Sequence, residues 1–119
     1  MIYTGYFSRT KIYENAGLVP ISISRWTPKW FDGEKCTSLA PSPDLLNRYK
    51  EGTASIQDYE SEFLAMLNTI DVRTIVENLA RGRDIVLCCY EKPTDFCHRH
   101  LIAKYLNDKY GMDIQEYPI

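Results

Sequence analysis

The sequence predicts an α/β domain, and two observations lead to this prediction. Short apolar stretches typical of strands alternate along the chain with stretches of helical periodicity, which favours parallel strands joined by helical crossovers. One stretch, Asp84 to Cys89, is apolar almost throughout, as expected of a central strand covered on both faces. With 119 residues, 45% of them hydrophobic, the chain suffices for one domain, residues 1–119. We therefore expect three layers around a small, mainly parallel, Rossmann-like sheet.

The strands before this central one are expected near the N-terminus. Residues Ile2 to Phe7 are β-prone, and they run into the polar triplet Ser8 to Thr10. A second strand is expected over Leu18 to Ile23, where apolar and polar residues alternate. Periodicity then fails from Ser24 to Pro43, which predicts a long irregular loop. Its aromatic residues are more typical of a binding loop than of a connector.

Helix signals follow the loop. Ser42 and Pro43 are expected to start a helix that runs to about Lys50 and stops before Gly52. Ser55 is expected to cap the next helix, with Asp58 completing an imperfect capping box. Asp71 is expected to cap a third, which Gly82 ends.

The last elements follow the central strand. Thr94 or Asp95 is expected to cap a final helix that reaches about Tyr110, and residues Met112 to Tyr117 are expected to form a last strand.

The net charge and the apolar pattern of the sequence indicate which classes of partner to expect. The formal net charge is −2 and the pI is about 5.6, so a general nucleic-acid-coating role is not favoured. No apolar stretch approaches the ~20 residues needed to cross a bilayer, and the first residues do not resemble an export signal. We expect a cytoplasmic protein whose four cysteines are free thiols: Cys36, Cys88, Cys89 and Cys97. Cys88 and Cys89 are neighbours on a strand, so they should face opposite sides of the sheet.

The segment from Cys88 to Arg99 carries the strongest functional signal. Ligands of open α/β sheets bind beyond the carboxyl ends of the strands, and helix N-termini attract anions. Cys97, His98 and Arg99 fall in the expected first turn of the last helix. A thiol there can ionise readily, and histidine moves protons near neutral pH. Cys97, His98 and Glu91 are the candidate catalytic residues, whereas His100 is expected on the solvent face.

Arginines at three expected strand ends suggest an anion site. Arg99 can bind a phosphate or carboxylate through two hydrogen bonds. Arg9, beside Ser8, and Arg25 follow the first two strands. A stacking surface is expected from Trp30, with Trp26 and Phe31 nearby. We expect a small phosphorylated or nucleotide-like ligand here, with or without turnover.

The stretch LCCYEKPTDFCHRHLIAKYL resembles the C-terminal hallmark of the family called domain of unknown function 488. That hallmark is an apolar strand, C-x-E, a proline-containing loop and C-H-R at a helix start. Six residues match it: Cys89, Glu91, Pro93, Cys97, His98 and Arg99. The stretches YTGYFSR and PISISRWTPKWF are also similar to short members of the family. The resemblance implies an intracellular α/β fold and a shared site, but neither a reaction nor a cofactor.

Two alternatives belong to other functional classes. Cys89, Cys97 and His98 could bind a metal, with Cys36 or Glu91 as a fourth ligand. Their C-x7-C-H spacing matches no common structural zinc pattern, and their soft donors would favour zinc or iron. The second alternative is a non-catalytic adaptor that docks onto a protein partner through the loop from Trp26 to Phe31.

Overall fold

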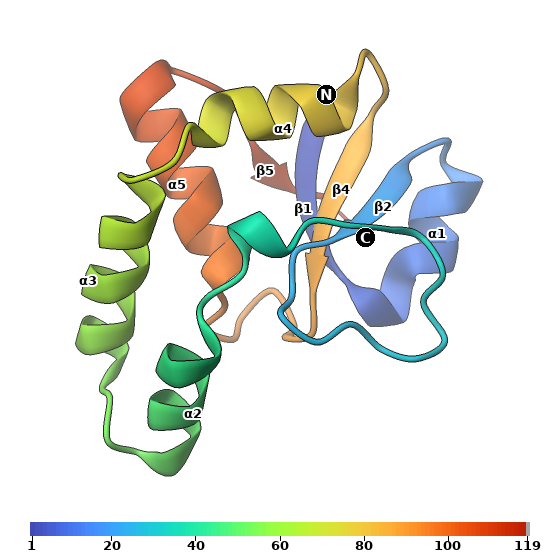
Figure 1. The fold of residues 1–119 in the computed structure, drawn as a ribbon. Coiled ribbons are helices and arrows are strands. Elements are labelled where there is room, and N and C mark those ends of the chain that lie inside the picture. The colour runs from blue at the N-terminus through green and yellow to red at the C-terminus, as the bar shows by residue number, and fades with distance from the viewer. Residues whose placement is uncertain (119) are drawn as a thin grey trace.

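A computed structural model describes residues 1–118, and it confirms the predicted α/β class (Figure 1). Five strands form one sheet within these residues, in the order β3-β2-β4-β1-β5, and every pairing is parallel. The strands are β1 (Ile2–Tyr6), β2 (Val19–Ser22), β3 (Glu34–Lys35), β4 (Ile85–Cys89) and β5 (Gln115–Glu116). The helices are α1 (Thr10–Asn15), α2 (Pro43–Glu51), α3 (Ile56–Leu67), α4 (Val72–Ala80) and α5 (His98–Tyr110).

The helices cover the two faces of the sheet unequally. Helix α1 packs on one face together with Phe7 and Phe31, whereas α2 to α5 gather on the other (Figure 1). Alternate residues of the fully buried β4 divide between these faces. Ile85 and Leu87 belong to the larger core, and Val86 and Cys88 belong to the smaller core around Tyr13. The larger core therefore lies between the sheet and helices α2 to α5.

Local capping signals set three helix starts as predicted. The hydroxyl of Ser42 accepts a hydrogen bond from the Leu45 amide, and Asp71 accepts one from the Thr74 amide. Ser55 and Asp58 form a full reciprocal capping box. These bonds satisfy amides that have no partner inside a helix, so the sequence signal is physically local.

Helix α1 and strand β3 were missed, and the start of the last helix was predicted too early. The prediction ended the first strand in a polar triplet, but α1 begins at Thr10. The long loop contains the two-residue strand β3. The last helix begins at His98 rather than after Thr94 or Asp95, and its N-cap is Cys97 in extended conformation. No helix among the described residues is long and apolar enough to span a bilayer.

Candidate functional site

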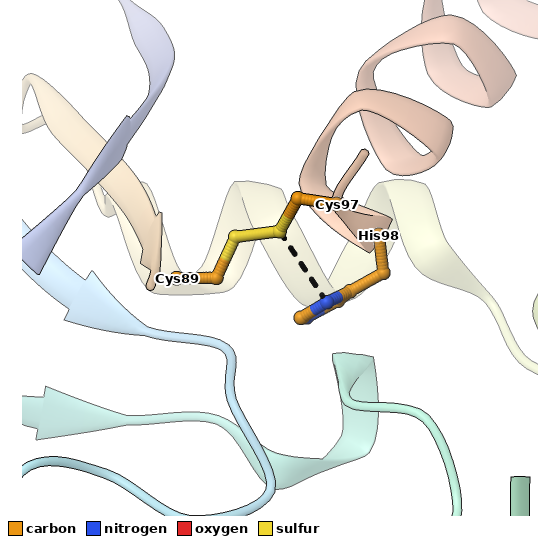
Figure 2. Close-up of side chains that lie close together, drawn as sticks. All are labelled: Cys89, Cys97 and His98. Atoms are coloured by element: carbon orange, nitrogen blue, oxygen red, sulfur yellow. Dashed lines mark hydrogen bonds between the residues drawn. A yellow bond between two sulfur atoms is a disulfide. The ribbon is translucent and has the colours of Figure 1, made fainter. Parts of the chain in front are cut away.

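The carboxyl end of β4 and the start of α5 bring Cys89, Cys97 and His98 together (Figure 2). Cys89 ends β4 on the face that α5 covers, Cys97 caps α5, and His98 is its first residue. All three are buried, and their two sulfur atoms and one ring nitrogen lie within 4.8 Å of one another. Residues from two separate elements thus bring together three atoms that could bind one metal ion.

Cys89 and Cys97 form a disulfide, with their Cα atoms 7.4 Å apart. The prediction of four free thiols is therefore wrong for this pair, whose members are brought together by the strand–loop–helix connection. Cys36 and Cys88 are free. Cys88 lies on the opposite face of the sheet from Cys89, as predicted, and burial raises the pKa of its thiol to about 12. Cys88 is thus a core residue rather than a reactive thiol.

The imidazole of His98 is fixed in one orientation. Its Nε2 lies 2.8 Å from the Ile23 carbonyl oxygen, just beyond β2. A carbonyl oxygen can only accept, so Nε2 carries the proton and donates. Burial lowers the pKa of His98 to about 4, which keeps the ring neutral at pH 7. The lone pair is consequently on Nδ1, which lies 3.7 Å from Cys97 Sγ (Figure 2).

The side chain of Arg99 forms hydrogen bonds with a different set of residues. Its side chain is fully buried, and its Nε and Nη2 each donate to a carboxylate oxygen of Glu116 at 3.0 Å. Nη1 donates to Cys89 Sγ at 3.0 Å, and Thr4 donates to Glu116 from β1. Burial alone would raise the pKa of Glu116, but the hydrogen bonds from Arg99 and Thr4 bring it below its usual value. The Arg99 guanidinium, which was expected to bind a ligand, holds β5 against α5 instead.

His100 was expected on the solvent face, but it is only partly exposed. Its Nε2 is buried and has no hydrogen-bond partner among the described residues. Burial, followed by the charge of Arg99, lowers the pKa of this histidine. The ring is thus a neutral neighbour of the Arg99 network near pH 7.

A cavity of about 180 Å³ opens beside Cys97 and His98. Arg25, Lys50 and Glu91 contribute charged groups to its lining. The remaining surface is largely aromatic, from Trp26, Tyr49, Tyr59, Tyr90 and Phe96. Because Glu91, Cys97, His98 and Arg25 line this one cavity, the structure brings together four of the predicted site residues.

The other predicted residues lie elsewhere. Ser8 and Arg9 are exposed, and Arg9 donates to the Tyr6 hydroxyl at 3.2 Å. Trp30 is 62% exposed and lines a second hollow, beside α1. The three arginines therefore do not share a cleft: one lines the cavity, one is exposed, and one is buried in an ion pair.

Sequence reasoning missed several contributors to the region, and three of them illustrate why. Lys50 and Tyr49 come from the end of α2, and Glu116 comes from β5. An aromatic residue beside a lysine near a helix end carried only a weak signal. The position of Glu116 opposite Thr4 follows from the β1–β5 register, which the sequence did not reveal.

One of three comparisons with known proteins identifies a family. The family model described as "Active DUF488-N3 subclade" matches residues 14–110, a range that includes the β4–α5 segment. No match was found among the curated proteins or the solved structures. The match spans most of the chain and includes Cys89, Cys97 and His98. The chain therefore belongs to the DUF488 family, in its DUF488-N3a subclade.

Proposed function

We propose that the protein binds a small anionic ligand with a planar ring, phosphorylated or nucleotide-like, in the cavity beside Cys97 and His98. The observation that carries this proposal is the lining of the cavity, where aromatic side chains and two cationic groups surround one space. The cavity also lies beyond the carboxyl ends of β2 and β4, where open α/β sheets bind their ligands.

The aromatic residues supply a surface for the ring. Trp26 is 52% exposed, so part of its indole is accessible to a ligand ring. Tyr90 donates to the backbone carbonyl of Trp26 at 2.7 Å and holds this part of the loop. Tyr49 and Phe96 form the deeper wall, with their ring centroids 5.7 Å apart. A cavity of this volume suits one small molecule better than an extended polymer.

Arg25 and Lys50 supply the positive charge. Arg25 donates to the carbonyl oxygens of Pro41, Thr37 and Ala40, so its guanidinium is held in place without being neutralised. The Lys50 Nζ lies 5.3 Å from the centre of the Trp26 ring. Neither residue forms an ion pair within residues 1–118. A phosphate bound near Trp26 would complement both charges.

The remaining predicted residues would lie beside this ligand. The Nδ1 lone pair of His98 can accept a proton or a hydrogen bond. Glu91 is exposed at the same cavity and can act as a base. These groups are the basis for proposing turnover as a further property of the site. That the loop from Trp26 to Phe31 docks onto a protein partner stays a prediction.

Binding of a nucleotide panel tests this proposal. Calorimetry would compare inorganic phosphate, nucleoside monophosphates and the matching nucleosides. We expect monophosphates to bind more tightly than nucleosides, and Lys50→Glu to weaken this binding by about tenfold or more, a change of about 1.4 kcal/mol.

Lys29→Glu is the matched control, because Lys29 is exposed and outside the cavity lining. The two variants change the net charge equally. Equal affinities for the two variants, or nucleosides binding as tightly as monophosphates, would contradict the proposal.

A further inference from the structure

Cys89, Cys97 and His98 place two sulfur atoms and one ring nitrogen within 4.8 Å of one another. A sulfur and a nitrogen on a tetrahedral zinc ion lie about 3.5 Å apart when the zinc–sulfur and zinc–nitrogen bonds are about 2.3 and 2.0 Å. Cys97 Sγ and His98 Nδ1 are already 3.7 Å apart. The two sulfur atoms are bonded to each other in this structure, so after reduction they must move apart to about 3.8 Å before both can bind one ion.

The hydrogen bond of His98 prepares its ring for a metal. Histidine ligands usually donate their second ring N–H to a carbonyl or carboxylate, which fixes the tautomer and the ring orientation. His98 does this through Nε2 and the Ile23 carbonyl at 2.8 Å. The free lone pair on Nδ1 faces the sulfur of Cys97 (Figure 2).

Charge and hydrogen bonding also suit a buried ion. Two thiolates and one neutral imidazole around a divalent cation give a net charge of zero, which lowers the cost of burial. Arg99 Nη1 donates to Cys89 Sγ at 3.0 Å, and such outer-shell bonds orient thiolate ligands. Because Glu116 compensates the charge of Arg99, the guanidinium can serve this role without leaving an unpaired charge.

We propose that the reduced protein binds one zinc ion through Cys89, Cys97 and His98. The fourth position would face the cavity, because Cys97 and His98 line it. Three protein ligands with an open fourth position are the arrangement of catalytic rather than structural zinc. This site goes beyond the proposed ligand binding and does not depend on it.

The disulfide and the zinc ion exclude each other, since only thiolates bind the metal. A thiol reductant supplies two electrons to the Cys89–Cys97 bond, breaks it and is itself oxidised to a disulfide. The two cysteines lose their protons as zinc binds. In the reverse direction, a disulfide oxidant takes two electrons from the thiolates, the S–S bond forms again, and zinc leaves. The proposed centre therefore follows the thiol redox state.

Cobalt and zinc titrations of the untagged, reduced protein under anaerobic conditions test this centre. We expect one Co²⁺ per chain, with the absorption of tetrahedral cobalt and a sulfur-to-cobalt charge-transfer band. Zinc should displace the cobalt, and it should protect two thiols per chain from alkylation.

Three variants and two controls identify the ligands. Cys89→Ser, Cys97→Ser and His98→Gln should each weaken zinc binding by at least tenfold. Glutamine can still donate to the Ile23 carbonyl, so His98→Gln removes the ligand with little change in the fold. Cys36→Ser and Cys88→Ser should retain the cobalt spectrum, because both residues lie outside the group.

Oxidised glutathione should release one zinc ion for every two thiols lost, as measured with a chromogenic chelator. Absence of stoichiometric cobalt, a spectrum without charge transfer, or unchanged affinity in folded His98→Gln protein would overturn the proposal. Nucleotide binding by the oxidised protein is measured separately, so failure of the zinc centre is distinguishable from failure of the ligand site.

Discussion

His98 and Arg99 are neighbours at the start of α5, but their side chains belong to two different regions. His98 turns toward β2 and the cavity, where its Nδ1 has no protein donor within residues 1–118. Arg99 turns toward β1 and β5, where its three donor groups are all used by Glu116 and Cys89. We call these regions the open cluster (Cys89, Cys97, His98) and the closed network (Thr4, Arg99, Glu116).

The two regions differ in whether the hydrogen-bonding groups of their central side chain are all occupied. A buried cation whose hydrogen bonds are complete holds elements together, because moving it would leave an unpaired carboxylate. A buried imidazole with one nitrogen anchored and the other available can bind a proton or a metal. Arg99 was predicted to bind a ligand, but its donor groups are occupied by Glu116 and Cys89, whereas Nδ1 of His98 is left available.

Removing the arginine should have the largest effect on stability. Arg99→Ala leaves Glu116 half-buried without its bidentate partner, and we expect the free energy of unfolding to fall by about 3 kcal/mol. Urea denaturation measures this loss. Lys104→Ala is the control, because Lys104 forms an exposed pair with Asp108 one turn away, worth at most about 0.5 kcal/mol. Similar losses for the two variants would show that the closed network is not structural.

Lowering the pH should reduce the stability of the folded protein through protonation of His98. Its pKa is about 4 in the folded protein and about 6.5 in an unfolded chain. Between these pH values the unfolded chain binds more protons, so the folded state loses stability as the pH falls. From pH 6.5 to 5, the expected loss is about 1.5 kcal/mol. Urea denaturation in the presence of a chelator measures it without bound metal.

His98→Gln separates this effect from other titrating groups. The variant cannot gain a proton at residue 98, so its stability should change by less over the same pH range. His100 stays in both proteins, and any part of the slope that it causes should remain. Parallel slopes for the wild-type protein and the variant would contradict the assignment to His98.

Sequence reasoning succeeded where the signal was local. Ser42, Ser55 and Asp71 bond to amides three residues away, so the nearby sequence contains the whole cause of each helix start. The buried run of β4 was equally clear. Helix α1 and strand β3 were missed because the first has six residues and the second has two. Neither is long enough to show a period of its own.

The partners of the site could not be predicted in the same way. The sequence placed Cys97, His98 and Arg99 in one helical turn, but it did not show that their side chains diverge. Arg99 is held by Glu116, seventeen residues later, and His98 by the Ile23 carbonyl, seventy-five residues earlier. A backbone carbonyl has no sequence signal. The sequence therefore predicted that these residues lie at the carboxyl ends of the strands. The partners of each side chain there required the three-dimensional structure.

Replacing Arg9 should have the smallest effect, although Arg9 was predicted to share an anion site with Arg99. Its side chain is exposed and makes one hydrogen bond, to the hydroxyl of Tyr6. Arg9→Ala should therefore lower the free energy of unfolding by less than about 0.5 kcal/mol. Its affinity for nucleoside monophosphates should equal that of the wild-type protein, because Arg9 does not line the cavity. Calorimetry beside Lys50→Glu makes the comparison direct: a tenfold loss of affinity in Arg9→Ala would place the ligand at Arg9 and not in the cavity beside the open cluster.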